Sequence, residues 1–238
     1  MTAAPRILAF DTSAAHCAAA LLSEGEIVAA RVEAMAKGQA ERLMPLLEEV
    51  LADARLGWGE LDALGVGTGP GNFTGVRIAV AAARGLSLSL GIPAVGVTGF
   101  EAVRQRVGAE EDPLIVTLDT QRGGLAWQAF AAGAPDGPPR FAATEEEIAD
   151  ERFEGRPPGV VGPRAMALAM RLAAGARGGS VAARDAEASG GPAFDAADIA
   201  RVAAVRLRSG GPIPRPAPVY VRPADALPPR EAPPRVLP

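Results

Sequence analysis

Residues 67–75 read GTGPGNFTG, and this glycine-rich stretch decides how the first half of the chain folds. The apolar residues before it predict a strand, which its glycines and its proline then turn sharply. Asn72 or Thr74 can accept hydrogen bonds from the first free N–H groups of a helix that continues to Leu90. Gly91 follows at the position of a left-handed helix stop. The stretch therefore predicts a strand, a tight loop and a helix in succession.

Two roles are open for this loop. Its backbone N–H groups and the helix N-terminus can approach an anion, or the loop can be a tight turn that lets the helix pack close to its sheet. The residues match neither G-x-x-x-x-G-K-[ST] nor G-x-G-x-x-G, and no lysine is present to contact a phosphate. The motif by itself therefore leaves both roles open.

Composition narrows the class of protein. The 238 residues are 48% hydrophobic and 22% charged, which is typical of a globular chain with one large domain or two of about 100–150 residues each. A net charge of -4 with 4% aromatic residues argues against direct nucleic-acid binding. Cys17 is the sole cysteine, so no internal disulfide forms. The N-terminus lacks the features of a signal peptide, and no stretch approaches the ~18 uncharged apolar residues that span a membrane. These features predict a cytoplasmic location.

The first half contains five further elements. Apolar runs at 7–10, 17–22 and 27–32, separated by turn residues, predict three antiparallel strands. Apolar positions in Gln39–Ala54 recur at helical spacing. Residues 93–97 predict another strand. The order strand-strand-strand-helix-strand-helix-strand predicts a mixed five-stranded sheet, which is the ribonuclease H-like unit.

The second half repeats this pattern in weaker form. The strand Leu114–Leu118 ends in Asp119-Thr120, as the first strand of the chain ends in Asp11-Thr12. A second strand is expected at 125–131. The chain is thus predicted to be α/β, with a duplicated ribonuclease H-like, actin-like ATPase fold of two mixed-sheet subdomains, the second degenerate. The predicted boundaries are 1–103 for the N-terminal subdomain with its interface helices, 104–211 for the degenerate C-terminal subdomain, including helices at 164–174 and 195–208, and 212–238 for a Pro-rich tail.

Two acidic residues are candidates for chemistry. Asp11 and Asp119 end corresponding strands, and with Thr12 they could line a nucleotide cleft and hold Mg²⁺ and phosphate through water. Each aspartate could equally cap a turn through its side chain. His16 and Cys17 are neighbours on a predicted strand, so their side chains point to opposite faces and are poorly placed as a catalytic pair. One histidine and one cysteine cannot assemble a conventional zinc site.

Several motifs together resemble the TsaB (YeaZ) family. They are Phe10–Ser13, Gln39–Pro45, Gly67–Arg84, Gly91–Pro93 and Pro218–Arg222. The similarity is dense over roughly the first hundred residues and sparse afterwards. Its specific part is the pattern GPGxxTGxR within the second helix and the loop before it. A catalytic sister family shares this pattern, so it identifies the superfamily better than the subunit.

The resemblance implies a role in tRNA modification. TsaB-like proteins act with the catalytic sister TsaD and the ATPase TsaE, which together place threonylcarbamoyl on N6 of adenosine 37 in tRNAs that read ANN codons. The sister family holds a metal through an H-x-x-x-H pair, and the matching positions here are Gly99 and Val103, which cannot bind metal. The resemblance therefore implies a non-catalytic dimerisation and scaffold subunit with no cofactor and no metal. Its implied partners are a TsaD-like subunit in a heterodimer, a TsaE-like ATPase, a second copy when the chain is free, and tRNA only indirectly.

The two N-terminal helices are the implied interface. The apolar stripe of Gln39–Ala54 is explained either by core packing or by a partner helix, and Arg77 and Arg84 lie on one side of the next helix. The predicted interface residues are Leu43, Met44, Leu47, Val50, Leu51, Phe73, Arg77, Val80, Ala81 and Arg84. This interpretation makes the glycine loop a structural turn that positions the helix after it.

Two enzymes are the alternatives. The first is a stand-alone nucleotide-binding ATPase or phosphotransferase of the actin-like superfamily, which would use Asp11 and Asp119. The second is a peptidase, which would need a metal or a nucleophile that the sequence lacks.

Overall fold

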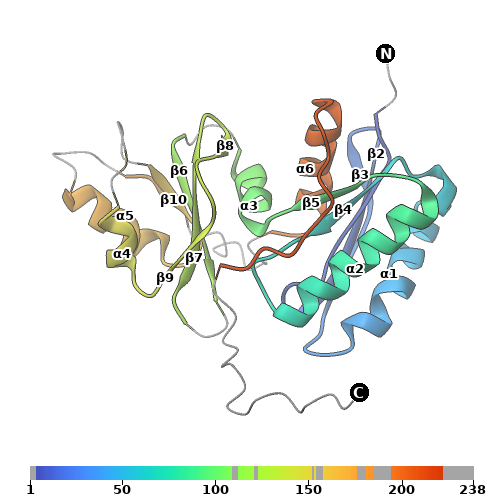
Figure 1. Ribbon diagram of the computed structural model, residues 1–238, viewed down its shortest axis with the longest axis horizontal. Coiled ribbons are helices and arrows are strands. Elements are labelled where there is room, and N and C mark those ends of the chain that lie inside the picture. The colour runs from blue at the N-terminus through green and yellow to red at the C-terminus, as the bar shows by residue number, and fades with distance from the viewer. Residues whose placement is uncertain are drawn as a thin grey trace, which may run out of the picture.

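Two mixed β-sheets lie end to end along the molecule, with helix α3 (Gly99–Val107) between them (Figure 1). This computed structural model describes residues 4–108, 112–120, 123–151, 153, 158–175, 181–184 and 194–221. Phe100 and Val103 of α3 pack against Leu114 and Val116 of the second sheet. Ala102 of the same helix packs against the first sheet.

The first sheet has the strand order β3-β2-β1-β4-β5. Its strands are β1 (Ile7–Asp11), β2 (His16–Ser23), β3 (Glu26–Ala34), β4 (Ala63–Gly67) and β5 (Ala94–Val97). β1, β2 and β3 pair antiparallel, whereas β1, β4 and β5 pair parallel. The predicted meander followed by two crossovers is confirmed.

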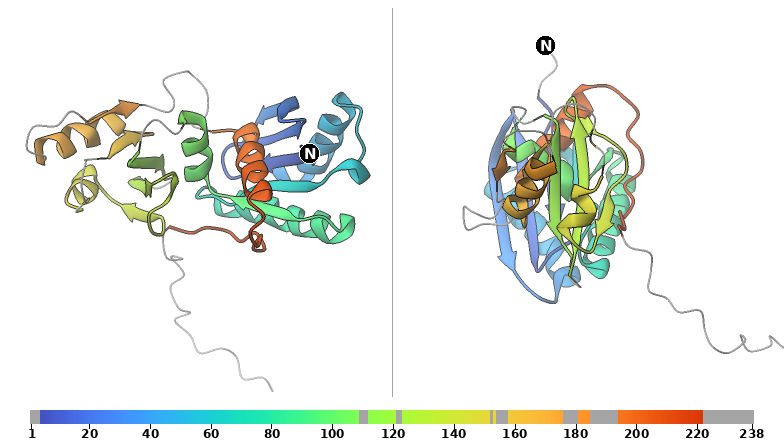
Figure 2. Two further views of the ribbon diagram at one scale, coloured as in Figure 1. Left: turned by 90° about the horizontal axis from the view of Figure 1, so that it is seen from above. Right: turned by 90° about the vertical axis from the view of Figure 1, so that its left-hand side faces the viewer.

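Alternation along β1 divides the helices between the two faces of this sheet. Leu8 and Phe10 point to the face covered by α1 (Gln39–Asp53) and α2 (Phe73–Leu90). Ile7 and Ala9 point to the other face. That face is covered by α6 (Ala196–Arg208), which lies beside α3 in the middle of the molecule (Figure 2). A short 3₁₀ helix, η1 (Trp58–Glu60), precedes β4.

The predicted ends of α2 are confirmed. The Asn72 side chain accepts hydrogen bonds from the backbone N–H of Thr74 at 3.0 Å and of Gly75 at 3.4 Å. Gly91 ends the helix with a φ of 69°, a left-handed conformation that favours glycine. These two caps fix the helix between the glycine loop and β5.

The second sheet repeats the first. Its order is β11-β10-β6-β7-β8, with β9 also paired to β7. Its strands are β6 (Leu114–Asp119), β7 (Leu125–Ala131), β8 (Ala134–Pro135), β9 (Arg140–Ala142), β10 (Gly159–Val161) and β11 (Ala183–Arg184), and its helices are α4 (Glu145–Ala149) and α5 (Ala165–Gly175). β6 pairs antiparallel with β7 and parallel with β10, as β1 does with β2 and β4. The duplicated actin-like fold is confirmed, and its second copy has shorter outer strands.

Helix α6 belongs to the first sheet in space, although the predicted range 104–211 groups it with the second. Ile199, Ala200 and Ala203 pack against Ile7 and Val95. The chain therefore forms the second sheet first and then returns, as α6, to complete the first core. The division at 103 and 211 stays a prediction.

Helix α3 was absent from the sequence-based assignment. Thr98 and Glu101 form a capping box at its start, with the Glu101 N–H donating to Thr98 Oγ1 at 3.2 Å and the Thr98 N–H donating to Glu101 Oε2 at 2.9 Å. This T-x-x-E pattern is the sequence signal that identifies the helix start.

The segment after α6 is extended and lies against the N-terminal half. We name residues 209–221 the strap; it is red in Figure 1. The Val219 N–H donates to the Thr68 carbonyl at 2.8 Å, and Arg84 Nε donates to the Pro216 carbonyl at 2.8 Å. The motif Pro218–Arg222 thus has a fixed place up to Val221. The rest of the predicted tail at 212–238, from Arg222 on, lies outside the described residues.

Candidate functional site

The glycine loop packs directly on the turn that follows β1. A Cβ atom at Gly75 would lie 1.9 Å from the Thr12 carbonyl oxygen, and one at Gly71 would lie 2.3 Å from that of Ser13. The Thr12 hydroxyl in turn donates to the Gly75 carbonyl at 2.7 Å. These contacts require glycine because any side chain would collide with backbone. The geometry is that of a close-packed structural turn.

Asp11 lies inside that turn and is fully buried. Its Oδ2 accepts hydrogen bonds from the Ser13 N–H at 3.1 Å, from the Ser13 hydroxyl at 2.9 Å and from His16 Nε2 at 2.8 Å. Its Oδ1 has no partner and faces Gly67, where a Cβ would lie 1.9 Å from it. Asp119 is exposed at the end of β6. The cleft of Asp11, Thr12 and Asp119 stays a prediction.

The position matching the sister family's metal site is filled by apolar side chains. A Cβ at Gly99 would lie 2.8 Å from the Phe194 ring and 3.0 Å from Leu118. Val103 is fully buried between the sheets. No group of three or more His, Cys, Asp or Glu side chains that could hold a metal occurs among the described residues. Cys17 is buried in the first core, and this burial together with the nearby Glu33 charge raises the pKa of its thiol to about 11.

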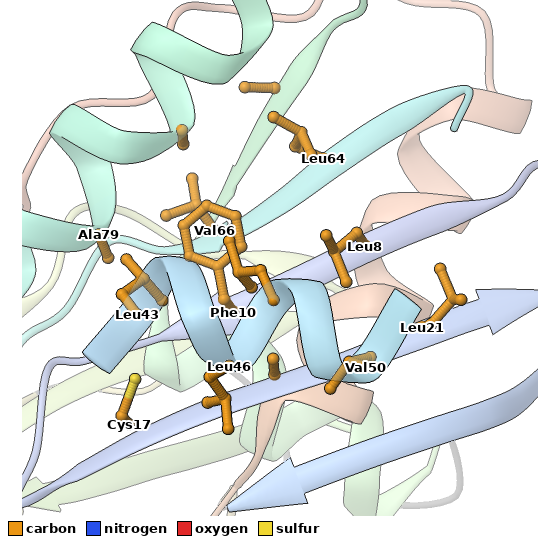
Figure 3. Packing of buried hydrophobic residues seen from close by; sticks show 14 of the residues in the cluster. Leu8, Phe10, Cys17, Leu21, Leu43, Leu46, Val50, Leu64, Val66 and Ala79 are labelled. Atoms are coloured by element: carbon orange, nitrogen blue, oxygen red, sulfur yellow. The ribbon is translucent and has the colours of Figure 1, made fainter. Parts of the chain in front are cut away.

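The apolar stripe of α1 packs into the protein's own core. Figure 3 shows Leu43, Leu46 and Val50 on the inner side of α1, packed toward Phe10 and the rest of the first sheet. Five of the ten predicted interface residues are at most 3% exposed: Leu43, Leu47, Val50, Leu51 and Val80. These five cannot contact a partner unless the core opens. Met44, at 37% exposed, is the only member of the α1 set at the surface.

The four accessible members on α2 lie in one row, which Leu88 extends beyond the predicted set. Phe73, Arg77, Ala81, Arg84 and Leu88 are exposed and follow at intervals of four, four, three and four residues, which is one side of a helix. We call this row the outer α2 face. Phe73 is 48% exposed and Leu88 is 80% exposed. The face thus combines apolar ends with two arginines and a small residue at its centre, and α2 has no acidic residue.

An aromatic cluster fixes one end of the outer α2 face. The Arg77 guanidinium stacks on the Phe73 ring, 3.5 Å from its centroid, and its Nε donates to the Tyr220 hydroxyl at 3.0 Å. The rings of Phe73 and Tyr220 lie 5.2 Å apart. Tyr220 was not among the predicted site residues, because 143 residues separate it from Arg77 in the sequence. The surrounding PVYVR motif was the sequence signal that could have identified Tyr220.

Ion pairs tie one side of α1 to β3. Arg42 donates to Glu33 at 2.7 Å and to Glu49 at 2.7 Å, and Arg31 donates to Asp53 at 2.8 Å. The hydrogen bonds from Arg42 lower the pKa of Glu33 and Glu49, and those from Arg31 lower that of Asp53. All these groups are partly exposed, so the pairs contribute little to stability.

Helix α2 also has the length and mean hydropathy, 1.2, at which a helix could cross a membrane. Its Val76, Ala79, Val80 and Ala83 instead pack in the first core. Because α2 contains Arg77 and Arg84, it is not an uncharged membrane-spanning stretch. This composition is that of a core helix with one exposed side.

The repeated strand order defines the class: the chain is a duplicated α/β protein of the actin-like ATPase fold. A family model described as TsaD: tRNA N6-adenosine threonylcarbamoyltransferase matches residues 27–135. The chain is 30% identical over 154 residues to the tRNA threonylcarbamoyladenosine biosynthesis protein TsaB of Escherichia coli, covering 63% of this chain and 66% of that protein. It is 37% identical over 99 residues to the protein of the same name from Haemophilus influenzae, covering 42% of each.

The solved structures agree. YeaZ from Pseudomonas aeruginosa superposes with a TM-score of 0.69 at 25% identity, over 91% of this chain and 99% of that one. The chain belongs to the TsaB (YeaZ) family. The aligned regions span 42% to 66% of the length of the two curated relatives.

Proposed function

We propose that this chain is a non-catalytic subunit in tRNA threonylcarbamoyladenosine biosynthesis. In this role it supports a TsaD-like catalytic subunit that adds threonylcarbamoyl to N6 of adenosine 37 in tRNAs reading ANN codons. The relatives named TsaB and the match to the TsaD family model support this pathway. The observation that carries the non-catalytic role is the apolar packing at Gly99 and Val103, where the sister family has its metal-binding histidines.

The partner surface in this proposal is the outer α2 face. Exposed Phe73, stacked Arg77 and Tyr220 are residue types that dominate the energy of protein interfaces. Ala81 lies between the two arginines and allows another helix to approach closely. A TsaD-like subunit uses this face in the heterodimer, and a second copy uses it when the chain is free. A TsaE-like ATPase joins the assembled pair, and tRNA contacts this acidic chain only indirectly.

The test is Ala81→Glu, which places a charge at the centre of this face. Glutamate is a good helix former and the site is exposed, so the monomer should keep its fold. We expect affinity for the TsaD-like subunit of the same organism to fall about ten-fold or more, because a charge would be desolvated in the contact. Co-elution by size exclusion and titration calorimetry measure this effect.

Met170→Glu is the matched control. Met170 is 69% exposed on α5, in the other half of the molecule. This variant should bind as tightly as the unchanged chain, and both variants should keep the thermal midpoint of the parent. Equal binding of Ala81→Glu and Met170→Glu would contradict the proposed surface.

A further inference from the structure

A groove of about 450 Å³ lies between the two halves, away from the outer α2 face. Arg104 and Gln105 of α3 line one wall, and Val202 and Val205 of α6 extend it. Phe130 and Pro135, from the hairpin of β7 and β8, form the opposite side. The volume and the mixture of apolar walls with a few polar groups are typical of small-molecule sites.

Arg104 is a buried cation in this groove, and none of the described residues gives it an anionic partner. Arg104 is only 8% exposed, and its Nε is buried with no hydrogen-bond acceptor among the described residues. One guanidinium nitrogen, Nη1, donates to the carbonyl of Gly108 at the end of α3. No carboxylate of the described residues forms an ion pair with it. Burying a guanidinium in this way costs free energy, because burial removes its hydration shell and one carbonyl acceptor replaces only part of it.

Glu101 is the acidic residue among those that line the groove, and it already has hydrogen-bond and ion-pair partners. Glu101 accepts hydrogen bonds from the Thr98 N–H and hydroxyl, each at 2.9 Å, and is paired with Arg206. Arg206 also donates to the Gly96 carbonyl. The formal charges of Glu101, Arg104 and Arg206 therefore leave the groove with one uncompensated positive charge.

We propose that this groove binds a small molecule that carries an oxyanion, either a carboxylate or a phosphate. The oxyanion accepts hydrogen bonds from the Arg104 guanidinium, whose planar group suits such oxygens. The apolar part of the ligand contacts Phe130 and Pro135 on one side and Val202 and Val205 on the other. A ligand there contacts both halves of the protein, so its binding stabilises their junction. This inference does not depend on the proposed role of the outer α2 face.

The experiment compares thermal unfolding of the full chain and of Arg104→Met at constant ionic strength. Inorganic phosphate or acetate replaces chloride in a titration. The unchanged chain should show a saturable rise of its midpoint with one of the two anions, because an anion that binds only the folded state stabilises it. Arg104→Met should show no such rise. In chloride alone it should unfold at a higher temperature than the unchanged chain, because the unpaired buried charge is gone.

Arg208→Met is the matched control, since it removes an exposed arginine from the end of α6. It should keep the anion response of the unchanged chain. A response to phosphate or to acetate identifies which oxyanion the groove prefers. An equal response in all three proteins, or no response in any, would overturn the proposal. So would a midpoint of Arg104→Met in chloride below that of the unchanged chain, because Arg104 would then stabilise the fold without a ligand.

Discussion

At the scale of single residues, the glycines of 67–75 are set by steric contact. The sequence alone left an anion loop and a tight turn open, because both need glycine. The structure favours the turn, since the Thr12 and Ser13 carbonyls occupy the space that side chains at Gly75 and Gly71 would fill. Such contacts join segments about 60 residues apart, and no local pattern encodes them. The caps Asn72 and Gly91 could be predicted because they act within a few residues.

This difference predicts opposite effects of two substitutions on α2. Gly75→Ala should destabilise the fold by about 1–3 kcal/mol, because the new methyl group overlaps the Thr12 carbonyl and the turn must shift. Gly85→Ala is the control, since nothing lies within 4 Å of its Cβ position. That change should stabilise the helix by about 0.5–1 kcal/mol. Urea unfolding of both variants measures the two free energies, and equal effects would refute the steric explanation.

At the scale of the element, the amphipathic pattern of α1 predicted the helix but not what covers it. The same leucine stripe fits a core or a partner, because both bury apolar surface. In the structure Leu43, Leu47, Val50 and Leu51 of this stripe are core, as is Val80 of α2. Helix α3 escaped prediction for a related reason. It is buried on two sides, against both sheets, so its apolar residues form no single stripe.

The strap makes a testable contact between elements. Tyr220 holds it to α2 through the Phe73 ring and Arg77, so Tyr220→Ala should loosen the strap with a cost of about 0.5–1.5 kcal/mol. The Val219 amide, which donates to the Thr68 carbonyl, should then exchange its hydrogen faster. The Thr68 amide is the internal control, since its bond to the Val97 carbonyl lies within the sheet. Tyr220→Phe keeps the ring contact and should have the smaller effect. Unchanged exchange at Val219 in Tyr220→Ala would show that other contacts hold the strap.

At the scale of the whole molecule, the duplication was predictable and the return of α6 was not. Two strands that each end in Asp-Thr, followed by similar element orders, revealed the repeat. The sheet order of the second half then followed from the first. Helix α6 has an ordinary amphipathic pattern, and nothing in that pattern says which sheet it covers. Its packing on Ile7 and Val95 closes the first core with residues from the far end of the chain.

The N-terminal half should therefore not fold without α6. A fragment of residues 1–103 leaves Ile7, Ala9 and Val95 uncovered and should show no cooperative thermal transition. Residues 1–108 joined to 194–221 by a Gly/Ser linker of about 12 residues, with a mean span of about 20 Å, should unfold cooperatively because the linker restores α6 to its face of the sheet. Ile199→Asp in the joined fragment should abolish that transition, since a buried carboxylate would replace an apolar contact. Calorimetry and near-ultraviolet circular dichroism measure these outcomes. A cooperative transition in 1–103 alone would show that the first sheet forms its core without α6.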